Sequence, residues 1–254
     1  MSTWILLRGL TRESRHWGDF PERLAQALPG ADIVTLDFPG NGKLHALESL
    51  TTVEAMAEYC RQELARHGRP PPYRILAMSL GAMVAVAWTV GHPKDIERCV
   101  LINTSMRPFS PFHHRLRPGN YAHLLKLLAL GGEPLDWEGT ILRMTSHHPA
   151  DSGSVVKAWV AYREEFAVSR RNAMRQLLAA ARFTAPAAKP ACPVLILAST
   201  RDALVNAACS RELADRWQCR IVEHPTAGHD IALDDADWVV RQVADWAGSP
   251  GIAG

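Results

Sequence analysis

The sequence lacks any run of about 18 consecutive apolar residues, the length that a membrane-spanning helix requires. It also has little excess of either charge, because 28 Lys and Arg stand against 26 Asp and Glu. Nucleic-acid-binding domains usually carry a strong basic excess, so no nucleic-acid partner is expected. The apolar part of the N-terminus is too short for a secretory signal peptide and predicts a strand that begins almost at once.

Cysteines are few and do not form metal-binding patterns. There are five in 254 residues, and no two are spaced as Cys-x-x-Cys. This odd number argues against a disulfide framework and against a zinc site, so no metal is expected. Cys99 and Cys192 stand beside strand-like runs, where a buried thiol is the common interpretation. Unpaired thiols favour a reducing compartment, and we therefore expect a cytoplasmic protein.

Short apolar runs alternate with longer amphipathic segments, which indicates a parallel sheet flanked by helices. The predicted strands cover residues 4–7, 32–36, 73–78, 96–102, 193–198 and 220–223. Several are continuous runs of Val, Ile and Leu, as expected of strands that are covered on both faces. The predicted helices between them cover residues 16–28, 51–67, 80–91, 204–217 and 234–247. Thr51, with Glu54 three residues later, resembles a capping box at the start of the second helix.

The alternation stops between about residues 104 and 185, where the sequence is helical without a convincing strand. The predicted helices there cover residues 121–130, 140–145, 154–163 and 172–181. We therefore expect a core formed by residues 1–103 and 186–254, with residues 104–185 inserted as a helical lid. Residues 104–190 contain 12 Lys and Arg against 6 Asp and Glu. That excess indicates either solvated helix faces or a lid that attracts acidic substrates.

A serine stands in a strand–turn–helix context in the run Ala77-Met78-Ser79-Leu80-Gly81. So tight a turn leaves the serine exposed and requires small residues on either side of it. The serine also lies at a helix N-terminus, where free N–H groups and the helix dipole favour developing negative charge. The run therefore indicates a nucleophilic serine, and the simpler alternative is a serine that only caps the helix.

This run resembles the nucleophile elbow of the α/β-hydrolase family of serine hydrolases, whose usual pattern is Gly-x-Ser-x-Gly. Ala77 replaces the first glycine and is small enough for the turn. The run from Asp37 to Gly42 resembles the family's Asp-x-Pro-Gly-x-Gly loop, for which a structural role as a turn is expected. The resemblance spans nearly the whole chain outside the lid. It begins at the family's third strand, so the usual antiparallel N-terminal strand pair is expected to be missing.

The resemblance implies the other two members of a catalytic triad. The family's acid lies in a loop after a late strand, where this chain has Asp202, and its histidine lies in a later loop, where this chain has His229. The chain order Ser, Asp, His is that of α/β-hydrolases. Some members place the acid after the preceding strand, but Asn103 occupies that position without a charge. His229 would then take the proton of Ser79, and Asp202 would orient the imidazole.

An oxyanion hole needs two backbone N–H donors. The resemblance implies Leu80, which follows the nucleophile, as one of them. In the family the second donor follows a His-Gly pair after the first core strand. Arg8-Gly9 stands there, so Leu10 is the implied second donor. Arg8 is expected to hold the Leu10 loop through hydrogen bonds to backbone carbonyls, and binding of an acidic substrate group is the alternative.

The resemblance thus implies an α/β-hydrolase fold with a mostly parallel sheet of about six strands. It also implies a serine hydrolase that cleaves an ester or thioester of a small-molecule acyl substrate through an acyl-enzyme, without a cofactor. The same triad serves carbon–carbon bond hydrolases, amidases, lactonases and lyases, so these stay open. A non-catalytic binding protein is the alternative from another class, and an intact triad argues against it. The oligomeric state also stays open.

Overall fold

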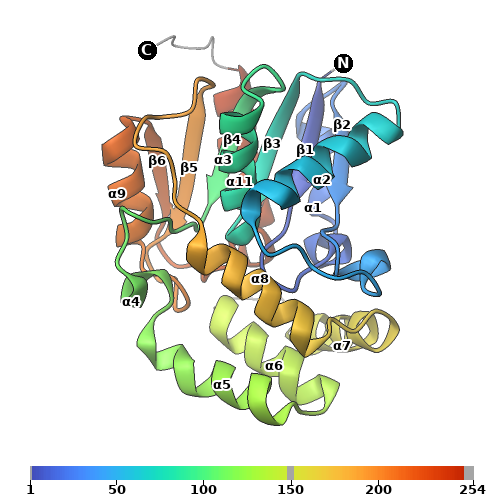
Figure 1. Cartoon of the computed structure of the whole chain (residues 1–254). Helices are drawn as coiled ribbons and strands as arrows, with labels where there is room; N and C mark the ends of the chain where they lie inside the picture. Colours follow the sequence, from blue (N-terminus) through green and yellow to red (C-terminus); the bar gives the residue numbers. More distant parts are fainter. Residues whose placement is uncertain (1, 148–151, 249–254) are drawn as a thin grey trace.

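A computed structural model describes residues 2–147 and 152–248. Its centre is one six-stranded sheet in the order β2-β1-β3-β4-β5-β6, and every pairing of neighbouring strands is parallel. The strands are β1 (Thr3–Leu7), β2 (Asp32–Leu36), β3 (Tyr73–Met78), β4 (Ile96–Ile102), β5 (Val194–Ser199) and β6 (Arg220–His224) (Figure 1). The predicted parallel sheet of about six strands is confirmed, and each strand boundary lies within one residue of its prediction.

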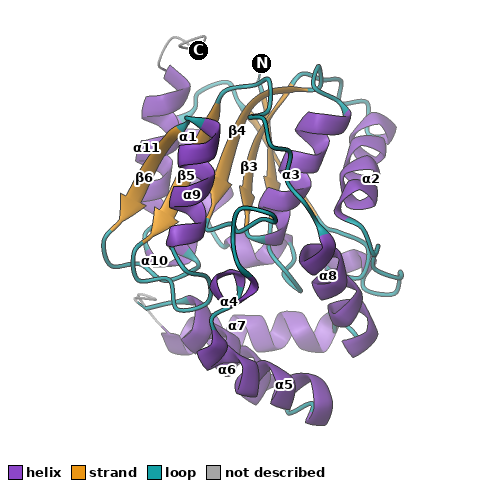
Figure 2. Ribbon diagram, turned by 60° about the vertical axis from the view of Figure 1, so that its left-hand side comes forward, coloured by secondary structure: helices purple, strands orange, loops and turns teal. Residues whose placement is uncertain are grey.

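Helices cover both faces of the sheet and divide the core in two. One face packs against α2 (Val53–Arg66), α3 (Leu80–Gly91) and α9 (Ala208–Trp217). The other face packs against α1 (Phe20–Ala27), α10 (Ile231–Asp234) and α11 (Ala236–Gly248). In Figure 2 the sheet lies between α11 on one side and α2 and α3 on the other. Burial on both faces explains why the central strands are continuous apolar runs rather than alternating ones.

Several predicted helix starts were wrong: α9 begins at Ala208 rather than at residue 204, and two further starts were wrong for local reasons. The residue that caps α2 is Thr52, whose hydroxyl accepts a hydrogen bond from the Ala55 N–H, so the capping box predicted from Thr51 does not form. The predicted helix 16–28 is divided into a 3₁₀ turn at Ser14–Trp17 and α1, because Gly18 between them has a φ of 57°. Only glycine adopts such a φ freely, and it ends the first turn.

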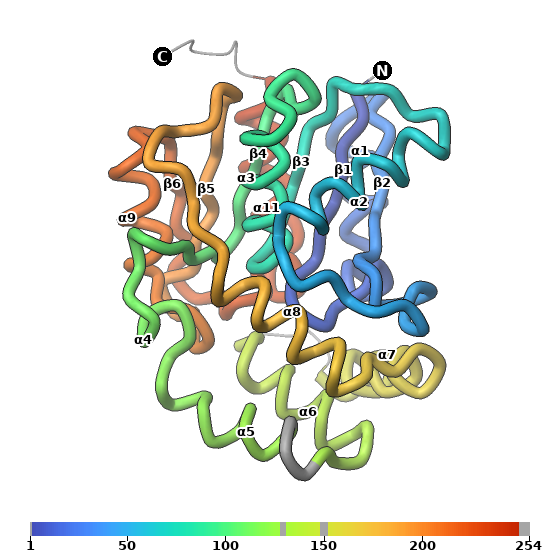
Figure 3. The backbone as a smooth tube through the Cα atoms, in the orientation of Figure 1, coloured from blue at the N-terminus to red at the C-terminus, as the bar shows by residue number. Residues whose placement is uncertain are grey.

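Between β4 and β5 the described chain forms helices and an isolated bridge but no further strand. These helices are α4 (Phe112–Arg115), α5 (Tyr121–Leu130), α6 (Pro134–Thr145), α7 (Ser152–Glu165) and α8 (Arg170–Arg182). Figures 1 and 3 show them gathered beyond the carboxyl ends of the strands, with α8 leading the chain back to β5. The predicted helix 140–145 is the second half of α6, and the one-turn α4 was not predicted because it is too short to show a period. None of the helices in residues 2–147 and 152–248 is long and apolar enough to cross a membrane.

The first turn of α3 lies directly against the end of β1. Ten consecutive residues of α3, Leu80–Thr89, are buried, as its apolar sequence predicts. A Cβ atom on Gly81 would lie 2.6 Å from the carbonyl oxygens of both Leu7 and Arg8. Backbone atoms cannot rotate away as a side chain can, so only glycine allows this approach.

Gly81→Ala is expected to lower the free energy of unfolding by about 1–3 kcal/mol, because the added methyl group overpacks rigid backbone. The better helix propensity of alanine offsets only about 1 kcal/mol. Urea denaturation followed by circular dichroism measures the loss. Gly91→Ala in the last turn of the same helix is the matched control, since a Cβ there meets no atom within 4 Å. Equal effects at the two positions would contradict the close approach.

Candidate active site

Ser79 occupies the turn between β3 and α3 with a φ of 53° and a ψ of −116°. Non-glycine residues rarely adopt this conformation, and where it occurs the surrounding structure must enforce it. Here the Ser79 N–H donates to the Ile102 carbonyl at 3.0 Å, and the Thr104 hydroxyl donates to the Ser79 carbonyl at 3.3 Å. The Ser79 hydroxyl makes no capping hydrogen bond to α3. The alternative that this serine only caps the helix is therefore not supported.

Asp202 and His229 lie together, although 27 positions separate them in the sequence. The Nδ1 atom of His229 is 2.7 Å from Oδ2 of Asp202, and the two residues are 3% and 2% exposed. The other carboxylate oxygen accepts hydrogen bonds at 2.8 Å from the N–H groups of Leu204 and Val205. Both oxygens of Asp202 are thus engaged, and the carboxylate is fixed in an orientation that faces the imidazole.

Asn103 holds the loop that carries His229. Its side-chain amide donates to the carbonyl oxygens of Gly228 at 3.3 Å and His229 at 2.7 Å. Its Oδ1 atom accepts from the Ser199 N–H at 2.8 Å. A carboxylate cannot donate, so the amide is the group that this position requires. From the sequence, Asn103 could only be excluded as the acid. An asparagine at the end of a strand is the one further signal of its role in holding this loop.

The loop after β1 passes directly over Ser79. A Cβ atom on Gly9 would lie 3.2 Å from the Ser79 Cβ and 3.7 Å from its hydroxyl oxygen. Leu10, the next residue, lines the same cavity as Ser79, Leu80 and His229. Leu80 is the first residue of α3, where a backbone N–H has no partner within the helix. The structure therefore brings four of the five sequence-predicted site residues to the wall of one cavity, and the fifth, Asp202, contacts His229 from behind that wall.

Gln176 on α8 fixes the other side of this loop, and no sequence pattern predicted this role. The residue is fully buried, and its Oε1 atom accepts from the Thr11 N–H at 2.8 Å. Its amide nitrogen donates to Asn41 at 2.7 Å and to Ser49 at 3.0 Å. Thr11 has a φ of 59°, a conformation that needs such support in a β-branched residue. Gln176 thus joins the loop containing Leu10 to α8.

Arg8 does not make the bonds predicted for it. Its guanidinium forms an ion pair with Asp230, with Nη1–Oδ1 at 3.2 Å and Nη2–Oδ2 at 2.5 Å, rather than bonding the backbone carbonyls of the Leu10 loop. It also lies over the ring of Trp17, 4.7 Å from the centroid. The expectation failed because Asp230 is 222 positions away in the sequence, and no local pattern predicts that contact.

The cavity beside Ser79 has a volume of about 460 Å³ and a mostly apolar wall. Much of that wall comes from the helical segment, through Leu116, Leu124, Ile141, Met144 and Leu177. Its arginines are bound to protein groups: Arg12 pairs with Glu138 at 2.6 Å, and Arg115 donates to the carbonyl oxygens of Ala180 and Ala181 at the end of α8. Burial lowers the pKa of Arg115. The cavity therefore offers mainly apolar surface to a ligand.

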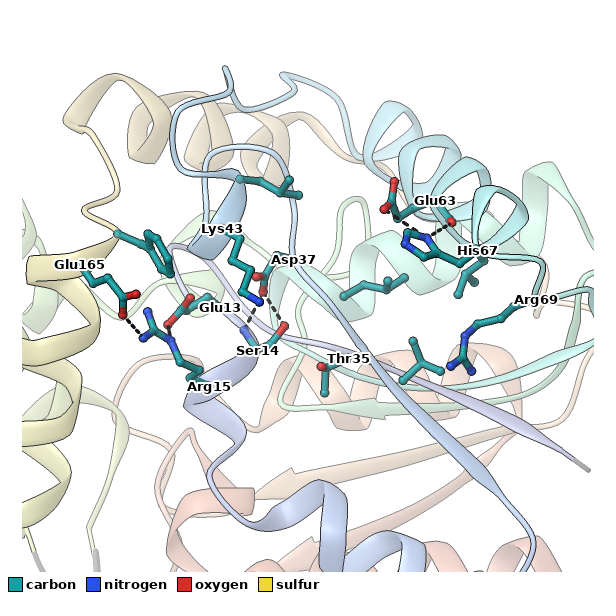
Figure 4. Close-up of a pocket in the computed structure, with 15 residues that line it drawn as sticks. Glu13, Ser14, Arg15, Thr35, Asp37, Lys43, Glu63, His67, Arg69 and Glu165 are labelled. Carbon is teal, nitrogen blue, oxygen red and sulfur yellow. Dashed lines mark hydrogen bonds and ion pairs between the residues drawn. The ribbon is translucent and has the colours of Figure 1, made fainter.

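A second cleft, of about 600 Å³, lies along the outer edge of β2 (Figure 4). Several of its charged groups are bound to neighbouring groups: Arg15 bridges Glu13 and Glu165 at 2.5 Å each, and Asp37 accepts from both the N–H and the hydroxyl of Ser14. Burial raises the pKa values of Glu13 and Asp37. Asp37 thus fastens the turn that follows β2, in keeping with the structural role predicted for it. None of the three residues predicted as a triad lines this cleft.

Comparison with known proteins agrees with this geometry. The model of the alpha/beta hydrolase family matches residues 4–242, so the chain belongs to that family and is a hydrolase. A pimeloyl-[acyl-carrier protein] methyl ester esterase of Chromobacterium violaceum is 26% identical over 237 residues, which cover 91% of this chain and 89% of the relative. A putative carbamate hydrolase RutD of Klebsiella pneumoniae is 26% identical over 173 residues, which cover 65% and 62% of the two chains.

Solved structures confirm the α/β-hydrolase fold. The esterase RhEst1 of Rhodococcus sp. ECU1013 superimposes with a TM-score of 0.79 at 18% identity, covering 98% of this chain and 91% of that one. The putative non-heme bromoperoxidase BpoC of Mycobacterium tuberculosis gives a TM-score of 0.78 at 21% identity, with coverages of 99% and 94%. At these identities the likeness shows the fold, and the chemistry has to be argued from the residues of this chain.

Gln176→Leu is expected to lower kcat by about 10-fold to 100-fold on any ester that the wild-type protein hydrolyses. It frees the Thr11 N–H and loosens the loop that presents Leu10, and small displacements of catalytic groups cost up to about 10²-fold. Steady-state kinetics on p-nitrophenyl esters measures the effect. Gln62→Leu on α2 is the control, because that exposed side chain bonds only Glu58. A fall in kcat no larger than that of the control would remove Gln176 from any role in the site.

Proposed function

We propose that the protein is a serine hydrolase in which Ser79 is the nucleophile, His229 the base and Asp202 the acid. The observation that carries the proposal is the 2.7 Å contact between Asp202 and His229, since His229 lines the same cavity as Ser79 in its strained turn. Since Nδ1 of His229 faces the carboxylate, Nε2 is the atom left to accept a proton. A non-catalytic binding protein would have no need for this buried pair.

The reaction follows from these positions. Nε2 of His229 takes the hydroxyl proton as the Ser79 oxygen attacks the carbonyl carbon, and Asp202 stabilises the imidazolium that forms. The N–H groups of Leu10 and Leu80 hold the negative oxygen of the tetrahedral intermediate. The intermediate expels the alcohol or thiol, which takes the proton from His229 and leaves an acyl group on Ser79. Water, deprotonated by His229, then releases the acid.

The substrate class that fits the cavity is an ester or thioester with an uncharged, apolar acyl group. Leucine and methionine are the commonest apolar residues of the wall, and its arginines are already bound to protein groups. The methyl ester esterase of Chromobacterium violaceum supports ester cleavage. The putative carbamate hydrolases support a second candidate, cleavage of a C–N bond by the same three residues.

We further propose that residues 104–185 form a lid over a core made of residues 1–103 and 186–254. Supporting this division, the segment lies beyond the carboxyl ends of the strands and supplies much of the cavity wall. The proposed chemistry uses no metal or other cofactor. Five free thiols, of which four are buried, favour the reducing cytoplasm as its location.

Ser79→Ala is expected to abolish labelling by a fluorophosphonate and hydrolysis of p-nitrophenyl esters, because the covalent bond forms at the Ser79 oxygen. The thermal melt should change by no more than a few degrees, since the hydroxyl caps nothing. Mass spectrometry of the labelled protein identifies the modified residue. Labelling that persists at another serine in the variant would reject the assignment.

Asp202→Asn is expected to lower kcat by as much as about 10⁴-fold, because an amide favours the wrong imidazole tautomer while keeping the shape of the side chain. The variant should still be folded by circular dichroism. Asp237→Asn, at an exposed carboxylate on α11, serves as the control and should leave kcat unchanged. A loss of less than about tenfold in Asp202→Asn would mean that another group is the acid.

A further inference from the structure

The guanidinium of Arg8 lies where three loops of the site meet. Arg8 itself immediately precedes Gly9 and Leu10, the loop that passes over the nucleophile. Its Nη1 atom is 3.5 Å from the sulfur of Met78, the residue before Ser79. Both of its terminal nitrogens bind Asp230, the residue after His229. One side chain, at the start of the proposed oxyanion loop, thus contacts the residue before the proposed nucleophile and the residue after the proposed base.

The pair between Arg8 and Asp230 is buried, with each side chain 4% exposed. Removing two charges from water costs free energy that their mutual attraction offsets only with good geometry, so a buried pair is poor evidence of a stability role. The geometry here is a two-point contact between a planar guanidinium and a carboxylate, which fixes orientation as well as distance. The stacking of Arg8 on Trp17 fixes the guanidinium plane further.

Asp230 is fixed on its other side by the helical segment. Its backbone N–H donates to the carbonyl oxygen of Thr145, the last residue of α6, at 2.7 Å. One carboxylate oxygen also accepts from the Leu233 N–H at 3.3 Å. Gly228, on the far side of His229, lies so close to Thr145 that a Cβ would be 2.7 Å from the same carbonyl oxygen. The backbone around His229 is therefore held by Thr145, and Arg8 adds the link to the opposite wall.

We propose that Arg8 and Asp230 are a positioning pair that sets the place of His229 relative to the oxyanion loop of Leu10. The inference rests on the proposed function, because it assigns the pair a role in that reaction. Neither residue exchanges a proton with substrate. The pair acts through His229 on one side and through the Leu10 N–H on the other, and its joint charge is neutral.

The charge of the pair gives a signature that a purely structural contact lacks. The charged groups around the His229 loop are Asp202, the Arg8–Asp230 pair and Asp234, which accepts from the Gly228 N–H at 2.7 Å. The titratable His224 accepts from the Ala227 N–H at 2.9 Å and contacts Asp235 at 3.2 Å, and neither residue is changed in the variants below. Removing only Asp230 leaves a cation that opposes protonation of the imidazole, and removing only Arg8 leaves an anion that favours it. The acidic midpoint of the kcat/KM profile should therefore move to lower pH in the first case and to higher pH in the second.

The experiment compares Arg8→Met, Asp230→Asn and the double variant on uncharged p-nitrophenyl esters. Each single variant should lower kcat by about 10²-fold with KM changed less than threefold, because the catalytic groups are displaced after substrate has bound. The double variant should lose no more than the worse single variant, since the two residues act as a unit. Arg74→Met and Glu97→Gln, a two-point pair between β3 and β4 far from the cavity, are the controls.

Circular dichroism melts accompany the kinetics. Should either single variant fail to fold, Arg8→Lys replaces it: lysine keeps the charge but not the two-point contact, so kcat should fall while the acidic midpoint stays. Additive losses in the double variant, a midpoint that moves the same way in both single variants, or kcat within threefold of wild type would each overturn the proposal. A wild-type protein that neither hydrolyses esters nor takes a fluorophosphonate label would instead reject the proposed function.

Discussion

The contact between the first turn of α3 and the end of β1 is the constraint on which the arrangement of the site depends. It is a contact between backbones, made possible by the missing side chain of Gly81. Because the two backbones touch, Ser79 at the head of α3 comes so close to Gly9 after β1 that a Cβ on Gly9 would lie 3.2 Å from the Ser79 Cβ. This packing contact in the core therefore brings the proposed nucleophile and Leu80 to the loop of Leu10, which Gln176 also holds.

Three loops of the proposed site are also held from outside the core, by the helical segment between β4 and β5. The loop of Asp202 is held by the Arg117 N–H, which donates to Leu204 at 2.9 Å, and by Asn120, which donates to Ala203 at 2.8 Å. The loop of His229 is held at Thr145, and the oxyanion loop at Gln176. Three parts of the segment, residues 117–120, Thr145 and Gln176, thus each hold a different loop of the proposed site. A segment that shapes the cavity wall also sets the geometry of the groups within it.

The sequence predicted the parts of the site that local patterns encode. Ser79 could be found because a strand, a tight turn and an apolar helix follow one another in fewer than twenty residues, and the family resemblance then led to Asp202 and His229. Asn103, Gln176 and the partner of Arg8 could not be found this way. Their contacts join residues that lie 96 to 222 positions apart, and no periodicity or turn chemistry encodes such a pairing. The error over Arg8 has the same origin.

Helix starts were predicted less well than strands for a related reason. A buried strand is bounded where its apolar run ends, whereas a helix begins where a particular side chain turns back to the backbone. Thr51 and Thr52 are equally good caps by composition, and the chain path into α2 selects the second. Similarly, α6 begins at Pro134, several residues before the apolar stretch from which a helix was predicted.

The contacts between the helical segment and these three loops also limit how the segment can be exchanged between members of the family. A helical segment grafted from another family member at residues 104 and 185 would bring a new cavity wall into this core. It would not bring partners for Thr11, Ala203 and the Asp230 N–H, which in this chain are supplied by Gln176, Asn120 and Thr145. A functional exchange therefore has to include the helical segment together with the three core loops that it contacts. A change in the helical segment that alters the cavity wall is therefore expected to alter the support of the three loops as well.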